Sequence, residues 1–400
     1  MDPVARLALS IAVILAVAKL GGEIAVRLRQ PSVLGEILAG VVLGSLSHPF
    51  LEGLRTDPSI DLLARLGVLI LLFEVGLEST VRDVLQVGFA SVRIAVLGTL
   101  GTLILGWGAA AVALPASSTL VHVFLATAMT ATSIGITARV LKDSGAARSR
   151  EANAILSAAV LDDIFGLIAL AIVTATVTQT AAGLAVTPWA IGWLVVKTVG
   201  FLALAIAAGV RFSPVLFRIM SRLHTSGALL ATGLSFCFVL AWASDAIGLA
   251  PIIGAFTAGL ILEESHSARF VERGEASLSV QVEPISSWLV PIFFVLMGMR
   301  ADFSALFHPR SLLLVALLTV AAVVGKLACA LGAPRGTKRL AIAVGMLPRG
   351  EVSLVFASLG QTMGVIDAGQ YSELVTVVIV TTLVTPAALR LQLKPRAVAA

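Results

Sequence analysis

The chain contains 400 residues, of which 58% are hydrophobic and only 13% are charged. A soluble protein carries about 25% charged residues, so this composition excludes a water-soluble globular protein. The formal net charge of +5 comes from basic residues that stand singly between apolar runs, and this pattern excludes a nucleic-acid-binding surface. Cys237 and Cys329 lie in apolar stretches, which excludes a disulfide framework and a zinc site. The class of protein that remains is a membrane protein with many transmembrane spans.

Apolar runs bounded by charged residues, Pro or Gly predict about thirteen transmembrane helices, since one spanning helix takes about 20 apolar residues. In chain order, these runs cover residues 4–26, 32–47, 60–77, 84–114, 119–141, 152–178, 188–210, 226–246, 249–262, 284–299, 311–332, 338–361 and 371–391. The first run is predicted to be a span rather than a signal peptide, because Asp2 lies in its short leading segment and a second run follows almost at once. The predicted fold class is an all-α polytopic membrane protein.

The basic residues predict the orientation of these helices. Most of the 28 Lys and Arg residues fall in connections on one side of the predicted membrane or in the C-terminal tail. The opposite side carries Arg6, Arg55, Arg300 and Arg310. Because cytoplasmic loops are enriched in Lys and Arg, we expect the N-terminus outside the cell and the C-terminus in the cytoplasm.

Two segments recur along the chain at an offset of about 220 residues, as expected for an internal duplication. Pro31–Gly40 is similar to Pro251–Gly259. Phe73–Glu78 is similar to Phe294–Arg300. One helix between the two copies reverses the orientation of the second copy, and this inverted topology is typical of secondary transporters. The predicted domains are a first six-helix repeat, a linker helix and an inverted six-helix repeat, at residues 1–178, 179–225 and 226–400.

Two neighbouring aspartates stand in the middle of the sixth predicted helix. Asp162 and Asp163 follow its start by about ten residues, or about 15 Å, which places them at the bilayer midplane. A charge there costs at least a few kcal/mol, so the pair needs a cation, protons or a basic partner. Lys326, in the eleventh predicted helix, is the candidate counter-charge. A purely structural carboxyl pair and a lysine that reaches toward the cytoplasmic surface are the alternatives.

Two predicted helices contain residues that weaken a helix. The fifth carries four hydroxyl groups and a glycine within residues 130–137, and the twelfth carries Pro348 and Gly350. Matching interrupted spans in two repeats predict discontinuous helices with a binding site near the midplane. We expect Arg349 and Glu351 to neutralise each other and the freed helix ends, rather than to bind the ion directly.

Four motifs carry a resemblance to a known family. They are Ala-Thr-Ser-Ile-Gly-Ile-Thr-Ala-Arg-Val-Leu at 131–141, Leu-Asp-Asp at 161–163, Gly-Lys at 325–326 and Pro-Arg-Gly-Glu-Val at 348–352. With them, the chain resembles bacterial sodium/proton antiporters of the NapA type, in the second cation/proton antiporter (monovalent cation:proton antiporter) family. The resemblance covers nearly the whole chain and includes the thirteen-helix plan with inverted repeats.

The resemblance implies a role for each motif. Asp163 is the main carboxylate that binds the transported Na⁺ and the proton, and Asp162 contributes to the ion site and pairs with Lys326. Thr132 and Ser133 lie at the crossing of the two broken helices, beside Asp163.

The resemblance also implies a homodimer in the bacterial inner membrane. An ion-transport core from about 84–178 and 311–400 moves against a dimerisation bundle formed by the remaining helices. No cofactor is implied, since Na⁺ or Li⁺ and H⁺ are the transported ions, and the lipid bilayer is the other partner. Glu74 departs from the family pattern, which has an apolar residue there, and leaves a further titratable group to be explained.

The predicted function is secondary active transport, not enzymatic catalysis. Na⁺ or Li⁺ is exchanged for H⁺ by elevator-type alternating access, with movement of net charge. Potassium/proton exchange is the main alternative, although potassium-specific relatives often lack the double aspartate and many carry a C-terminal nucleotide-binding domain.

Two functions of other classes are weaker alternatives. An intramembrane aspartyl protease needs two carboxylates that face each other across a water, whereas neighbours on one helix diverge by about 100°. A passive channel has no need of buried carboxylates that bind protons. A dependence of ion flux on the proton gradient distinguishes an exchanger from a channel.

Overall fold

The structure, a computed structural model, describes residues 2–78, 88–144, 146, 149–181, 188–220, 227–262, 276–303 and 308–393. Its regular secondary structure is helical, and no strand occurs within these ranges. In the same ranges, 8 helices are long and apolar enough to cross a membrane, in agreement with the predicted all-α membrane protein.

The described residues form two compact units. Unit 1 takes the described residues of Met1–Leu20, Leu46–Leu85 and Thr174–Leu296. Unit 2 takes those of Gly21–Ser45, Gln86–Val173 and Met297–Ala400. Each unit therefore combines segments from both halves of the chain.

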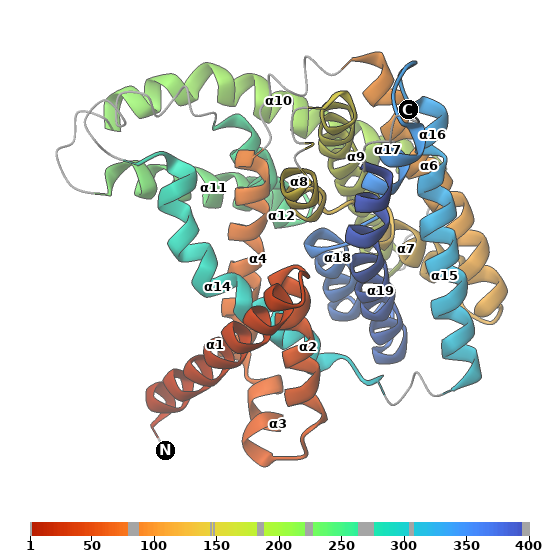
Figure 1. The fold of residues 1–400 in the computed structure, drawn as a ribbon. Coiled ribbons are helices and arrows are strands. Elements are labelled where there is room, and N and C mark those ends of the chain that lie inside the picture. The colour runs from red at the N-terminus through yellow and green to blue at the C-terminus, as the bar shows by residue number, and fades with distance from the viewer. Residues whose placement is uncertain are drawn as a thin grey trace. The chain divides into compact units, whose positions relative to one another are not determined.

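Unit 1 contains α3 (Pro49–Thr56), α4 (Pro58–Glu78), α10 (Pro188–Met220), α11 (Ala228–Ala246), α12 (Pro251–Ile261), most of α14 (Leu278–Arg300) and the start of α1 (Pro3–Arg27). Helix α12 lies against both α4 and α11 (Figure 1). A Cβ atom on Gly76 would lie only 3.0 Å from the Cα of Gly259, so glycine allows the backbones of α4 and α12 to approach closely. Cys237, on α11, is buried in this unit.

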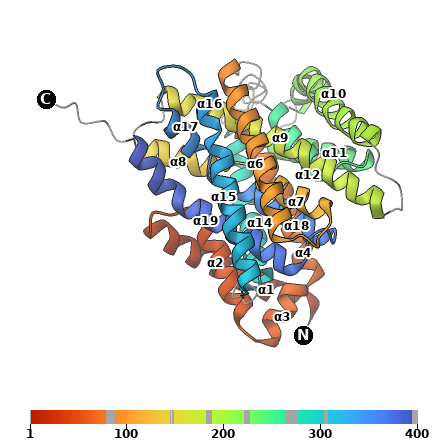
Figure 2. The ribbon, with the colours of Figure 1, turned by 90° about the vertical axis from the view of Figure 1, so that its right-hand side faces the viewer.

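Unit 2 contains α2 (Ser32–Ser45), α6 (Phe89–Ala113), α7 (Thr119–Ala128), α8 (Ile134–Asp143), most of α9 (Arg150–Ala181), α15 (Pro309–Leu327), α16 (Cys329–Gly332), α17 (Arg339–Gly345), α18 (Glu351–Thr362) and α19 (Ala368–Leu393). Helices α6 and α15 lie side by side (Figure 2). A Cβ atom on Gly101 would lie 2.6 Å from the carbonyl oxygen of Gly325. The two backbones therefore meet without intervening side chains.

Prolines mark the beginnings of several helices. Proline suits the first helical position, because its fixed φ matches a helix and the missing N–H has no intrahelical partner there. Such prolines open α4, α10, α12 and α15, at Pro58, Pro188, Pro251 and Pro309. The observed N-termini of these four helices lie within a few residues of the predicted ones.

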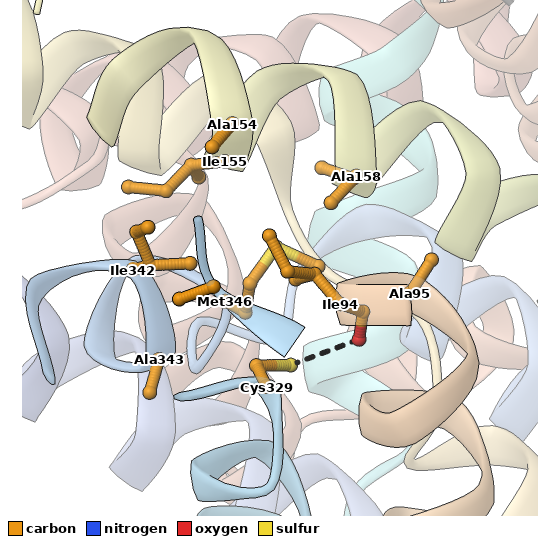
Figure 3. Packing of buried hydrophobic residues seen from close by; sticks show 11 residues of the cluster. Ile94, Ala95, Ala154, Ile155, Ala158, Cys329, Ile342, Ala343 and Met346 are labelled. Carbon is orange, nitrogen blue, oxygen red and sulfur yellow. Dashed lines mark hydrogen bonds between the residues drawn. The ribbon is translucent and has the colours of Figure 1, made fainter. Parts of the chain in front are cut away.

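A hydrophobic cluster joins α6, α9, α16 and α17 in unit 2 (Figure 3). Ile155 and Ala158 of α9 lie in it, with Ile94 of α6 and Met346 just after α17. Cys329 is also buried there, and its thiol donates a hydrogen bond to the carbonyl oxygen of Ile94 at 3.4 Å. Asp162 follows Ile155 by seven residues and Ala158 by four, so it continues the buried stripe of α9.

Helices occupy the predicted ranges, with a few differences in detail. The predicted helices 119–141 and 338–361 are each interrupted, as expected, and 311–332 also divides into α15 and α16 at Ala328. The short α3 was not predicted; the side chain of His48 caps it by accepting a hydrogen bond from the Phe50 N–H at 3.2 Å. Residues 84–87, 182–187 and 221–226 of the predicted elements, and 394–400 of the predicted core, lie outside the described residues.

Candidate ion-binding site

The two interrupted helices of unit 2 meet at their breaks. Helix α7 ends at Ala128 and α8 begins at Ile134, while α17 ends at Gly345 and α18 begins at Glu351. The breaks leave backbone groups without helical partners, which a membrane interior tolerates only if other groups bind them.

Hydrogen bonds between the two interrupted helices supply such partners. The Ser133 N–H donates to the carbonyl oxygen of Pro348 at 2.9 Å. The Thr137 hydroxyl donates to the carbonyl oxygen of Gly345 at 2.7 Å. Gly350 has no room for a side chain, since a Cβ atom there would lie 2.7 Å from the Cβ of Ser133. The predicted crossing of discontinuous helices is therefore present in unit 2.

Asp162 is surrounded by hydrogen-bond donors. The ammonium group of Lys326 lies 2.6 Å from each of its carboxylate oxygens, and both side chains are 0% exposed. The Thr99 hydroxyl donates to Oδ1 at 2.8 Å, and the Thr132 hydroxyl lies 2.7 Å from Oδ2. Because the charge of Asp162 is paired and both oxygens have further donors, the carboxylate is well accommodated in a dry interior.

Asp163 has a different environment, although it is the next residue of α9. It is 2% exposed, and its Oδ1 atom has no hydrogen-bond partner among the described residues. A buried carboxylate oxygen without a donor is costly, so this atom is suited to a cation or a proton. No cluster of three or more His, Cys, Asp or Glu side chains able to hold a metal ion occurs in the described part of the chain.

Arg349 binds backbone carbonyl groups of the first break and of α15. Its Nη1 atom donates to the carbonyl oxygens of Thr130 at 3.3 Å and Ala131 at 3.2 Å. Its Nη2 atom donates to the carbonyl oxygen of Ala322 at 3.3 Å. A cation at these carbonyl groups balances the partial negative charge where α7 ends. The carbonyl oxygen of Arg349 accepts a hydrogen bond from the Thr382 hydroxyl of α19.

Glu351 stands at the first position of α18, where the helix dipole favours a carboxylate. Its Oε2 atom accepts a hydrogen bond from the Ser133 hydroxyl at 3.0 Å. The expectation that Arg349 and Glu351 neutralise each other is wrong, since no ion pair joins them among the described contacts. The expectation that they neutralise the freed helix ends agrees with these positions, at the end of α7 and the start of α18. Each binds a different part of the first break, because Arg349 precedes α18 and Glu351 lies inside it.

The family comparison agrees with this geometry. Residues 12–394 match the family described as sodium/hydrogen exchanger, transmembrane. The chain belongs to this family. It is a multi-pass membrane transporter and not an enzyme, which excludes the aspartyl protease alternative.

Two curated relatives are similar in sequence to this exchanger over nearly its whole length. It is 35% identical to the high-affinity Na⁺/H⁺ antiporter NhaS3 of Synechocystis sp., over 96% of this chain and 88% of the relative. It is 32% identical to the Na⁺/H⁺-K⁺ antiporter GerN of Bacillus cereus, over 95% of this chain and 94% of the relative.

A solved structure has the same fold. The sodium proton antiporter MjNhaP1 of Methanocaldococcus jannaschii at pH 8 superposes with a TM-score of 0.69, over 96% of this chain and 97% of that one. The two sequences are 16% identical, so this similarity bears on the fold alone.

The exchanger brings the seven predicted site residues together within unit 2, with two changes in detail. The Thr132 hydroxyl contacts Asp162 rather than Asp163, and Ser133 contacts Glu351. Thr99 and Thr382, whose hydroxyl groups contact Asp162 and the carbonyl oxygen of Arg349, were not predicted. Nothing in the sequence marks these two among the many threonines of apolar helices.

Glu74 belongs to unit 1, on α4, and is not among the residues of this site. Its carboxylate accepts a hydrogen bond from Ser286 and lies near Glu283, both on α14. Glu74 therefore makes a polar contact between α4 and α14.

Proposed function

We propose that this exchanger moves Na⁺ against H⁺, and that Asp163 is the carboxylate that binds either ion. The contrast between neighbouring aspartates carries the proposal: both oxygens of Asp162 have donors, whereas Oδ1 of Asp163 is buried without one. A single carboxylate that takes a cation or a proton makes the two ions competitors, which is the basis of exchange. The name of NhaS3 as a Na⁺/H⁺ antiporter and that of GerN as a Na⁺/H⁺-K⁺ antiporter support the choice of ions.

In this proposal, Asp162 and Lys326 cause the exchange to move net charge across the membrane. Na⁺ beside Asp163 also attracts Asp162 and weakens its ion pair with Lys326. A buried ammonium group without its partner is unstable as a cation and gives up its proton. One proton then leaves Asp163 and one leaves Lys326 for each Na⁺ bound, so the cycle moves net charge.

The architecture in this proposal is that of the NapA type. Thirteen transmembrane helices form two inverted six-helix repeats around a linker helix. The N-terminus lies outside the bacterial cell membrane and the C-terminus in the cytoplasm. Support comes from the matched broken helices and from the distribution of basic residues. A core from about 84–178 and 311–400 moves against the remaining helices, which hold two copies of the chain together.

Flux measurements test the choice of ions. The purified exchanger is placed in liposomes that contain a pH-sensitive dye, and Na⁺, Li⁺ or K⁺ is added outside. We expect Na⁺ and Li⁺ to drive proton movement and K⁺ to do so weakly. Because GerN is named as a Na⁺/H⁺-K⁺ antiporter, K⁺ is a required arm of the experiment. Proton movement with K⁺ alone would replace the proposal by potassium/proton exchange, and flux without any proton gradient dependence would indicate a channel.

Cross-linking tests the moving core. Cysteine pairs that join the core to the second or ninth predicted helix should stop exchange until a reductant opens the link. Full exchange in completely cross-linked protein would favour a small local gate over an elevator movement.

A further inference from the structure

Three donor groups surround Asp162, and they come from two helices and one helix break. Lys326 belongs to α15, Thr132 to the break after α7, and Thr99 to α6. Thr99 is buried, and its hydroxyl lies 2.8 Å from Oδ1 of Asp162. The ion-exchange mechanism above makes no use of it.

The close contact between α6 and α15 positions Thr99 and Lys326 at the same carboxylate. A Cβ atom on Gly98 would lie 3.2 Å from the Cδ of Lys326, and the backbones meet directly at Gly101 and Gly325. This contact does not depend on the ammonium group. We therefore expect the Thr99 hydroxyl to keep its position when Lys326 releases Asp162.

The strength of the Thr99 hydrogen bond depends on what else neutralises the carboxylate. A hydrogen bond to an ionised group is stronger than a bond between neutral groups. It becomes stronger still when the other charged or polar partners of that group are removed. While Lys326 is bound, a full positive charge faces both oxygens of Asp162. Once Lys326 leaves, the hydroxyl groups of Thr99 and Thr132 are the remaining donors among those described. Thr99 thus stabilises the lysine-free state more than the lysine-paired state.

We propose that Thr99 is a positioning residue that stabilises Asp162 as a carboxylate after Lys326 leaves, and so lowers the Na⁺ concentration at which the ion pair opens. The inference rests on the proposed Na⁺/H⁺ exchange and deepens it. It assigns to α6, which contributes none of the predicted ion-binding residues, an effect on apparent ion affinity.

The test compares three variants in liposomes by their KM for Na⁺ and their maximal rate. Thr99→Val removes the hydroxyl at nearly constant volume and should raise KM about three- to tenfold, with a smaller change in maximal rate, because only the difference in hydrogen-bond strength between the lysine-free and lysine-paired states enters KM. Thr99→Ser keeps the hydroxyl and should restore KM. Thr102→Val is the matched control, because Thr102 is buried three residues further along α6 and its hydroxyl has no partner in the described structure.

A second comparison, in a variant without the lysine, distinguishes an effect on the ion pair from a general loss of function. In Lys326→Gln no ion pair must open, so adding Thr99→Val should leave KM for Na⁺ unchanged. If Thr99→Val does not fold, Thr99→Cys replaces it, since a thiol is a weaker donor of similar size. Na⁺-dependent stabilisation of the purified protein in detergent gives the same comparison without transport.

The possible results are distinct. Equal KM values in Thr99→Val and Thr102→Val, in an active exchanger, overturn the role of Thr99 and leave Na⁺/H⁺ exchange standing. An equal rise in KM with and without Lys326 also overturns it, because the effect would not act through the ion pair. A wild-type chain that exchanges no Na⁺ for H⁺ overturns both proposals.

Discussion

Asp162 and Asp163 are adjacent on one helix and both are buried, yet their surroundings differ. Asp162 faces α6, α15 and the first helix break, which together supply an ammonium group and two hydroxyl groups. Asp163 is turned away by about 100° and keeps an oxygen without a donor. The difference shows that one step along a buried helix separates a carboxylate whose bonds are complete from one that is open to an ion.

The two helix breaks differ in a related way. The first break contributes hydroxyl groups, of which Thr132 contacts Asp162 and Ser133 contacts Glu351. The second break contributes charged side chains, and Arg349 binds carbonyl groups at the end of α7. The hydroxyl-bearing break thus contacts Asp162 directly, whereas the charged break stabilises the ends of the broken helices.

The strongest way to test the contrast is to change the open aspartate. Asp163→Asn removes the proposed binding carboxylate, and we expect Na⁺-driven proton movement in liposomes to fall to background. The protein should still elute as a single folded species in detergent, since Asn fits the same volume. Exchange near the wild-type rate in this variant would mean that the ion binds elsewhere.

A second test removes the partner of the buried lysine. Asp162→Asn leaves Lys326 without a counter-charge, and breaking a buried pair in this way costs about 3–5 kcal/mol. Thermal unfolding in detergent should show a large loss of stability for Asp162→Asn. The double variant Asp162→Asn with Lys326→Gln should recover much of it. A double variant less stable than Asp162→Asn alone would show that the ion pair is not the main source of the loss.

The third test measures charge movement. In the wild type, the balance point of Na⁺ and H⁺ gradients should shift when the membrane potential is changed, because two protons are proposed to exchange for one Na⁺. In Lys326→Gln, one of the two proton sites is lost, and the balance point should become independent of voltage. A wild-type balance point that does not respond to voltage would rule out the proposed role of Lys326.

The smallest expected effect concerns the links between the breaks. Thr137→Val removes the donor to the carbonyl oxygen of Gly345 and should cost about 1–3 kcal/mol, since a buried acceptor loses its partner. Thr381→Val is the control, because its hydroxyl donates to the Val377 carbonyl oxygen within α19, where the helix itself also supplies an N–H. Equal losses of stability in both variants would contradict a special role for the crossing.

Much of the fold and part of the site could be predicted because lipid imposes strong physical rules. Long apolar runs locate the helices, and charges inside them are costly, so Asp162, Asp163 and Lys326 stand out. The interruptions at residues 130–137 and at Pro348 are visible because Pro, Gly and clustered hydroxyl residues weaken a helix.

Threonine contacts could not be predicted for a different reason. A threonine in a membrane helix commonly donates to the carbonyl four residues earlier, as Thr198, Thr232 and Thr257 do here. Thr99 instead donates across to Asp162, and only the packing of α6 against other helices decides this. The predicted pairing of Arg349 with Glu351 was wrong for the same reason, because proximity in sequence does not determine which neighbours a side chain meets.

The burial of both cysteines has a practical consequence for labelling experiments. Cys237 and Cys329 are enclosed by their own units, and Cys329 also donates a hydrogen bond to the Ile94 carbonyl oxygen. Water-soluble maleimides, which need an accessible thiolate, should therefore leave the folded native chain unmodified. Single cysteines introduced at exposed positions outside the candidate spans, such as Arg55 or Arg335, would carry a fluorophore or spin label without any change to the native thiols. The native sequence is thus a ready background for distance measurements during transport.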